Sequence, residues 1–200
     1  MLKFKVIGSG EYLRRGEQYL FEHGLAPSDD ADVLVCLAHP EILKAEEIAK
    51  YAKGCINFHC GLPNYRGRHP LQWMLIDGVP EIPCAVHFMD DGVDTGPILA
   101  QDVVAVDRDE PYATALAKVT AKVGPLLVEA FERIESGCLG NPQDKTAKPL
   151  PRRTPELSAL SFNRPSREVH CFINAMSDPM LAPPMARLVA PNLTWVAERA

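Results

Sequence analysis

The sequence predicts an α/β fold, with a Rossmann-like, mostly parallel sheet flanked by helices. Short β-branched runs alternate with helical patterns through the first half of the chain. This alternation is typical of βαβ units, which place their strands in one parallel sheet. The run at 33–37 is apolar throughout, as expected of a strand buried on both faces. The apolar fraction of 46% and the charged fraction of 24% are those of an ordinary globular chain.

The first half is predicted to hold three strands and two helices. The strands are expected where β-branched and apolar residues cluster, at 4–7, 32–37 and 55–59. The helices follow the helical apolar spacing between them, at 11–23 and 42–53. Gly24 and Gly54 come directly after these helices and are expected to end them, because glycine adopts the left-handed conformation of a C-cap without strain.

The second half begins with a helix at 71–76 and two strands at 84–88 and 98–106. The longest helical pattern spans 112–135 and ends before Gly137. Gly124 and Pro125 interrupt that pattern, and a kink or restart is expected there because proline removes a helical hydrogen bond. After Gly140 the polar, proline-rich run NPQDKTAKPLPRRTP predicts a linker or surface-hugging tail. A last helix is expected at 166–176, followed by the strand-like LTWVA.

Composition argues against several classes of partner. The net charge is −5 and no basic run is longer than Arg152-Arg153, so a nucleic-acid partner is not expected. No apolar run approaches the ~20 residues that span a bilayer. The N-terminal apolar run is too short for a signal peptide. Six scattered cysteines without a CxxC pair favour buried thiols in a reducing compartment, and we expect a cytoplasmic protein.

Three segments carry residues suited to chemistry. Asn57 and His59 lie two apart at the end of a predicted strand, so their side chains point to the same side. A loop at 64–70 is rich in cations, glycine and proline, and an acidic loop at 90–97 contains Asp94. Ligands of open parallel sheets bind at the carboxyl ends of strands. An Asn, a His and an Asp placed there suit acyl transfer, which needs a proton acceptor and donors to an oxyanion.

Simpler interpretations stay open for each segment. His59 alone is more often a structural residue, the acidic loop can be only a turn, and Arg66 and Arg68 can be only solvated. A metal site from Cys55, His59 and Cys60 is disfavoured, because neighbouring strand residues point to opposite faces. A nucleophilic Cys60 would need a base from elsewhere.

Two stretches resemble a known family. The runs INFHCGLPNYRGRHPLQW and CAVHFMDDGVDTGPILAQ are similar to the catalytic core of folate-dependent formyltransferases. The family's Asn-x-His, proline-containing loop and Asp-x-Gly fall on Asn57, His59, residues 63–67, and Asp94 with Gly96. The tail resembles that of sugar-nucleotide N-formyltransferases, such as those acting on UDP-4-amino-4-deoxy-L-arabinose. The resemblance implies a formyltransferase catalytic domain at 1–140, followed at 141–200 by a linker, helix and tail, the remnant of a C-terminal region.

The resemblance also implies a mechanism. The amine attacks the formyl carbon of 10-formyltetrahydrofolate, while Asn57 and a protonated His59 donate hydrogen bonds to the formyl oxygen. One such donor is typically worth roughly 3 kcal/mol. Asp94 orients His59 and helps to move protons. No metal is implied. The residues expected to bind folate are Leu37, Ala38, His39, Asp90, Asp91, Gly92 and Val93. The residues expected to face the acceptor are Tyr65, Arg66, Gly67, Arg68 and His69.

The chain departs from the family pattern at three places. The loop after His59 is one residue shorter and lacks the usual serine. The segment before Asn57 is about one βα unit short, so part of the folate pocket is expected to be rebuilt or opened. The relatives' second, mostly β domain is expected to be missing. The GSG at 8–10 lacks the third glycine of a dinucleotide fingerprint and is interpreted as a turn.

The acceptor amine is the least determined feature. A nucleotide-linked amino sugar is the first expectation, and an amino acid or siderophore precursor is the alternative. Methionyl-tRNA is disfavoured by the acidic balance and the missing second domain. A folate hydrolase and a non-catalytic folate-binding or partner-binding module stay open. A homodimer formed through the tail after Leu181 is a further hypothesis.

Overall fold

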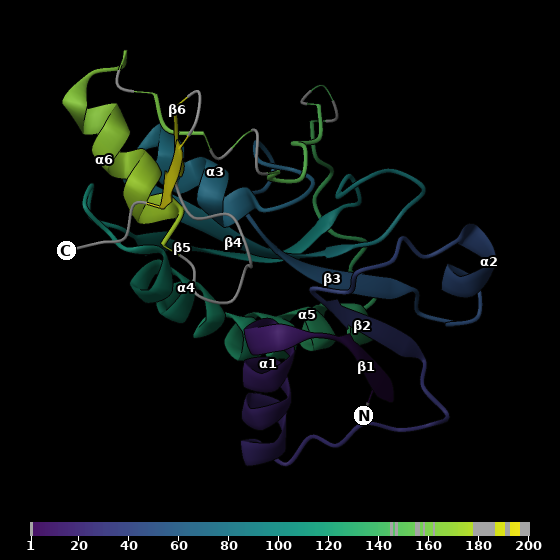
Figure 1. Cartoon of the computed structure of the whole chain (residues 1–200). Helices are drawn as coiled ribbons and strands as arrows, with labels where there is room; N and C mark the ends of the chain where they lie inside the picture. The colour runs from purple at the N-terminus through teal and green to yellow at the C-terminus, as the bar shows by residue number, and fades with distance from the viewer. Residues whose placement is uncertain are drawn as a thin grey trace.

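The protein is built around one five-stranded sheet (Figure 1). The computed structural model describes residues 2–144, 146, 148–154, 157, 159–161 and 163–177, and the backbone of 187–190 and 193–196. The strands lie side by side in chain order: β1 (Phe4–Gly8), β2 (Val33–Leu37), β3 (Cys55–Cys60), β4 (Glu81–Phe88) and β5 (Ile98–Ala105). All five predicted strands of this part of the chain are therefore present.

Most of the sheet is parallel, as predicted. Strands β1, β2 and β3 pair in parallel, whereas β4 pairs antiparallel with both β3 and β5. Strand β5 consequently runs in the direction of β1 to β3, and β4 alone is reversed. The α/β fold with a mostly parallel sheet is confirmed.

One expectation for the helices was wrong, and the expected restart of the long helix occurs slightly earlier than expected, at Val123. The helices are α1 (Gly10–Glu22), α2 (Ala45–Ile48), α3 (Pro70–Asp77), α4 (Tyr112–Thr120), α5 (Val123–Glu135) and α6 (Ser166–Ala175). The helix expected at 42–53 shrinks to the four residues of α2, which buries no side chain. The long helix breaks at Ala121 and Lys122, before Gly124 and Pro125. Pro125 lies in the first turn of α5, where its missing N–H has no helical partner to lose.

The main core lies between the sheet and helices α1, α4 and α5, which are drawn below the sheet in Figure 1, and it also includes residues of α3 and α6. Ile56, Phe58 and Cys60 of β3 belong to this core. Successive strand residues point to opposite faces, so Asn57 and His59 face away from it. Packing of three apolar side chains thus decides which way the two polar ones point.

The end of the chain forms a separate antiparallel pair, β6 (Arg187–Ala190) and β7 (Leu193–Val196). The strand-like run at 193–197 is thus a strand over 193–196, paired with β6. Most of the tail after Leu181, including the segment proposed for dimerisation, lies outside the described residues.

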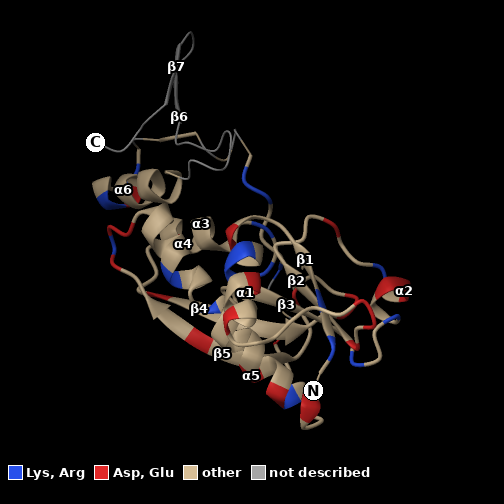
Figure 2. Ribbon diagram, turned by 90° about the horizontal axis from the view of Figure 1, so that it is seen from below, with Lys and Arg blue, Asp and Glu red and all other residues tan. Residues whose placement is uncertain are grey.

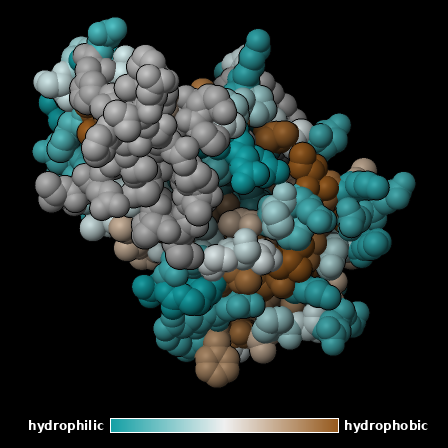
Figure 3. All heavy atoms as spheres, in the orientation of Figure 1, coloured by the Kyte–Doolittle hydropathy of each residue, from teal (hydrophilic) through white to brown (hydrophobic). Residues whose placement is uncertain are grey.

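Surface chemistry is mixed. Figure 2 shows acidic and basic residues interspersed over the helices. On the face seen in Figure 3, hydrophobic residues are exposed among hydrophilic ones. Among the described residues, no helix has the length and apolar character needed to cross a membrane.

Candidate active site

The side chains of Asn57 and His59 lie on the face of β3 that points away from the main core. Register places Cys36 of β2 beside Asn57, and His87 of β4 on its other side. His59 is 9% exposed. The interpretation that both residues project to one side of the sheet, away from the apolar core, agrees with this arrangement.

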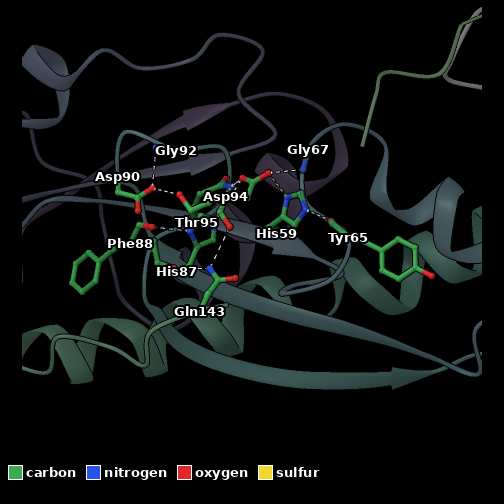
Figure 4. Close-up of polar contacts among 12 residues, drawn as sticks. His59, Tyr65, Gly67, His87, Phe88, Asp90, Gly92, Asp94, Thr95 and Gln143 are labelled. Atoms are coloured by element: carbon green, nitrogen blue, oxygen red, sulfur yellow. Dashed lines mark hydrogen bonds and ion pairs between the residues drawn. The ribbon is translucent and has the colours of Figure 1, made fainter. Parts of the chain in front are cut away.

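Asp94 joins them from the loop after β4 (Figure 4). Its Oδ2 lies 3.6 Å from His59 Nδ1, and its Oδ1 accepts a hydrogen bond from Asn57 Nδ2 at 3.4 Å. The main-chain N–H of Gly67 donates to Asp94 Oδ2 at 2.9 Å. The structure therefore brings Asn57, His59 and Asp94 together, and Gly67, for which no contact with Asp94 was expected, binds the same carboxylate.

The second ring nitrogen of His59 is also bonded. Its Nε2 lies 2.8 Å from the carbonyl oxygen of Tyr65, which can only accept. Nδ1 faces the carboxylate of Asp94. The two ring nitrogens of His59 therefore each face an oxygen acceptor, Tyr65 O at 2.8 Å and Asp94 Oδ2 at 3.6 Å.

His87 is a further member of the site that the sequence analysis did not single out. It is 1% exposed, and burial lowers its pKa to about 4, against the opposing effect of Asp94. The ring is therefore neutral near pH 7. Its Nδ1 lies 2.7 Å from Phe88 O and must carry the hydrogen, so Nε2 accepts from Asn57 Nδ2 at 3.3 Å. His87 Nε2 is also 3.7 Å from Asp94 Oδ1.

The loop at 90–95 is closed by Asp90. Its Oδ1 accepts from Gly92 N at 3.1 Å and from the hydroxyl of Thr95 at 2.5 Å. This Asp is thus a turn-forming residue, as the simpler interpretation had it. The expected folate-binding residues Asp91, Gly92 and Val93 are exposed beyond it. A Cβ on Gly96 would lie 1.9 Å from Phe88 O, so glycine is required there.

The end of β2 reaches the site through its backbone. Leu37 pairs with Phe58, so the exposed Ala38 comes beside His59. The Leu37 side chain packs in the main core, away from the site. Ser9 holds the segment, because its N–H donates to Leu37 O and its hydroxyl to Ala38 O, both at 3.0 Å. The GSG run therefore acts as a turn that braces the end of β2. The next residue, His39, is half-buried.

The loop at 64–70, called the acceptor loop because Tyr65 to His69 are expected to face the acceptor, has two side chains that turn away from the trio of Asn57, His59 and Asp94. The hydroxyl of Tyr65 donates to Asp77 at 2.8 Å, and its ring points away from His59 (Figure 4). Arg66 is fully buried and donates to the carbonyl oxygen of Asp144. The interpretation of Arg66 as a solvated cation is therefore wrong.

The other three residues of the loop stay at the rim. Gly67 reaches Asp94 through its backbone. Arg68 is exposed and donates to Pro40 O at 3.2 Å, which links the loop to the end of β2. His69 is half-buried and accepts from Arg153 N at 3.3 Å. Burial, aided by nearby arginines, lowers the pKa of His69.

Cysteine chemistry does not fit the site. Cys60 lies on the opposite face of β3 from His59, with its thiol 3.8 Å from the hydroxyl of Tyr12. Burial raises the pKa of Cys60 to about 11, so the nucleophilic thiolate is scarce near pH 7. No three His, Cys, Asp or Glu side chains gather in metal-binding fashion within the described residues.

Comparison with known sequences identifies relatives of this chain. The family model described as "Formyl transferase" matches residues 22–131, more than half of the chain. A methionyl-tRNA formyltransferase from Synechococcus sp. (strain JA-3-3Ab) is 33% identical over 150 residues, covering 74% of this chain and 47% of the relative. The chain thus spans about half the length of the curated relatives it matches.

Solved structures share the fold. HypX from Aquifex aeolicus, in complex with tetrahydrofolic acid, has a TM-score of 0.79 at 20% identity, covering 94% of this chain and 36% of HypX. An N-formyltransferase from Helicobacter canadensis, in complex with folinic acid and dTDP-3-aminofucose, has a TM-score of 0.70 at 15% identity. That match covers 89% of this chain and 81% of the other.

Proposed function

This chain belongs to the formyl transferase family, and on that premise we propose that it transfers a formyl group from 10-formyltetrahydrofolate to a primary amine. One observation carries the proposal: the carboxylate of Asp94 lies within 3.6 Å of His59 Nδ1 and 3.4 Å of Asn57 Nδ2. A donor pair and a proton acceptor are thus held together on the face of β3 that points away from the main core, with His59 near the carboxyl end of that strand.

Two side chains serve the oxygen on which negative charge builds. Asn57 donates over 3.3 and 3.4 Å to His87 and Asp94, which are long hydrogen bonds that a stronger acceptor can replace. A protonated His59 supplies the second donor from Nδ1, whose 3.6 Å separation from Asp94 Oδ2 is longer than a hydrogen bond, and this donor, being charged, is the stronger one. Each such donor contributes roughly 3 kcal/mol to stabilising the transition state.

Asp94 and His59 carry out the proton transfers of the proposed reaction. The attacking amine must lose one proton as its nitrogen bonds to the formyl carbon, and the departing nitrogen of the donor must gain one as its bond to that carbon breaks. The carboxylate, fixed by Gly67 N–H and facing His59, accepts the first proton, and the imidazolium provides a source for the second. No net proton is consumed.

The residues around the trio fit a folate donor, which supplies an activated formyl group when bound. A pterin ring presents amide-like donors and acceptors on its edge, and backbone groups are their natural partners. Exposed or half-exposed backbone flanks the trio at Ala38 and His39 on one side and at 91–93 on the other. The side chain of Leu37 packs elsewhere, so we assign it only a backbone role.

For the acceptor, we propose a nucleotide-linked amino sugar. The acidic balance of the chain and the resemblance of its tail to sugar-nucleotide formyltransferases support a small acceptor over an RNA. The Helicobacter canadensis neighbour, which contains an amino-sugar nucleotide, is consistent with it. Methionyl-tRNA is the second candidate, favoured by the 33% identity to enzymes that carry this name.

The test is an absorbance assay of tetrahydrofolate release from 10-formyltetrahydrofolate. Acceptors are a panel of amino-sugar nucleotides, methionyl-tRNA, or none, with products identified by mass spectrometry. Release that depends on one amino sugar establishes the first candidate, and dependence on methionyl-tRNA establishes the second. Release without acceptor indicates a hydrolase. Absence of release together with absence of folate binding in a titration overturns the proposed function.

A further inference from the structure

We propose that Gln143 is a positioning residue of the formyl-transfer site, acting through Asp94. Gln143 belongs to the return segment, defined here as residues 141–153, which follows the stretch matched by the family model. The sequence presents this segment as a linker. The activity readouts below rest on the proposed function, whereas the spectroscopic readout does not.

Asp94 needs external support for its backbone. Its φ of +53° is left-handed, a conformation that strains a residue with a Cβ. The carboxylate can face His59 and Asn57 only while this turn is kept. A neighbouring group that holds the turn therefore determines where the carboxylate lies.

Gln143 holds the turn at both ends. Its Nε2 donates to the carbonyl oxygen of Asp94 at 3.3 Å and to that of Gly96 at 2.5 Å, and Figure 4 shows it directed at the Asp94 backbone. One amide nitrogen has two hydrogens, so both are used. Gly96 lies close to the main chain of Phe88, because a Cβ added at Gly96 would lie 1.9 Å from Phe88 O. Gln143 thus ties the left-handed Asp94 to the closely packed Gly96.

The return segment is anchored on either side of Gln143. Asn141 exchanges two main-chain hydrogen bonds of 2.8 Å with Ile98 of β5. At the far end, Leu150 N donates to Arg66 O at 2.7 Å, and Arg68 N donates to Leu150 O at 3.2 Å. These contacts bracket Gly67, the residue whose N–H binds the Asp94 carboxylate. The segment therefore supports Asp94 from its backbone side and from its side-chain side.

The kinetic experiment replaces Gln143 by Met, which keeps the size of the side chain and removes the donor. We expect kcat to fall at least tenfold while KM for both substrates stays within twofold. Gln143→Glu, which also lacks the donor, is the second variant should the first fail to fold. Gln101→Met is the matched control, because Gln101 is an exposed residue on β5 away from these contacts.

A double-mutant cycle with Asp94→Asn separates positioning from a general loss of structure. If Gln143 acts through the Asp94 carboxylate, Gln143→Met lowers kcat little further once that carboxylate has been removed. Losses that multiply in the double mutant overturn the proposal, as does an unchanged kcat in the single mutants.

A spectroscopic readout distinguishes failure of this proposal from failure of the proposed function. Ring-nitrogen NMR signals of His59 and His87, which face Asp94 at 3.6 and 3.7 Å, should shift in Gln143→Met. The signals of the distant His23 should stay. If these shifts occur in a protein that transfers no formyl group, the positioning role stands and the proposed function fails. Unshifted signals overturn the positioning role whatever the activity.

Discussion

The main-chain nitrogen of Gly67 donates a hydrogen bond of 2.9 Å to Oδ2 of Asp94, 27 residues away in the chain. The same oxygen faces His59 Nδ1 at 3.6 Å. The acceptor loop thus fixes the carboxylate that serves the imidazole. Because a backbone group forms this contact, conformation at position 67 matters more than side-chain chemistry there.

Gly67→Ala should therefore damage the site. The residue has a φ of +93°, and an added Cβ would lie 2.5 Å from Leu150 O and 2.8 Å from Leu150 N. Backbone must move, since neither atom belongs to a flexible side chain. We expect kcat to fall by about 10- to 100-fold, in line with displacement of a reacting group by roughly 1 Å. Steady-state kinetics of formyl transfer measure the change.

Gly137→Ala is the control for that substitution. Gly137 has a similar φ of +78°, but nothing lies within 4 Å of an added Cβ. The two variants share the backbone strain of about 1 kcal/mol, and only the first displaces the return segment. Equal activity of both variants would contradict the role given to the Gly67 contact.

Asp94→Asn tests the charge at the centre of the site. Asparagine tolerates the left-handed backbone of this position, so the turn should persist while the proton acceptor is lost. We expect kcat to fall by roughly 10²- to 10⁴-fold, the usual contribution of general acid–base catalysis. Asp91→Asn, in the exposed part of the same loop, leaves in place the main chain through which 91–93 are proposed to face the folate, so it should keep near-normal kcat. A similar loss in both variants would point to the loop's overall charge instead.

Much of the fold was predictable because burial leaves a periodic signal. The apolar runs of β2 and β3 and the alternation around Asn57 and His59 are visible in the sequence. Strand direction leaves no such signal, so the reversal of β4 could not be read. The helix at 42–53 was overpredicted because its apolar residues pack only partly buried against a small cluster, and α2 buries no side chain.

The residues of the site also divide into those that could be predicted from the sequence and those that could not. Asn57, His59 and Asp94 were singled out by their places after predicted strands and by their motifs' resemblance to the family. His87 lies in the apolar run of β4, and only the strand register, which puts it opposite Asn57, makes it part of the site. Gln143 lies in a proline-rich stretch whose composition gives no indication of its path. Contacts between segments that lie far apart in the sequence could not be predicted from the sequence.

His87 should make the stability depend on pH. Burial lowers its pKa from 6.5 to about 4, so between these values the unfolded chain binds the proton more readily. The free energy of unfolding should therefore be at its full value above pH 6.5 and decrease as the pH falls towards 4. The full effect is about 3 kcal/mol. Urea unfolding at a series of pH values measures it.

His87→Gln should flatten this part of the pH profile. Glutamine can still hydrogen-bond but does not titrate, so the decrease below pH 6.5 should shrink to the part contributed by other groups, His69 among them. His23→Gln, at an exposed histidine of the first helix end, should leave the profile as it is. A profile unchanged by His87→Gln would show that the buried ring is not the source.

Arg153 should stabilise the fold far more than its neighbour Arg152. Its guanidinium lies 4.5 Å from the ring centre of Trp73 in α3 and 5.4 Å from that of Phe172 in α6, and the residue is only 6% exposed. Arg153→Ala removes a buried cation–π contact and the packing of its stem. We expect the free energy of unfolding to drop by about 2–4 kcal/mol. Arg152 is exposed, so Arg152→Ala should change that free energy by less than about 0.5 kcal/mol. Comparable losses in urea unfolding would mean that net positive charge, rather than contact with the two rings, holds α6 against α3.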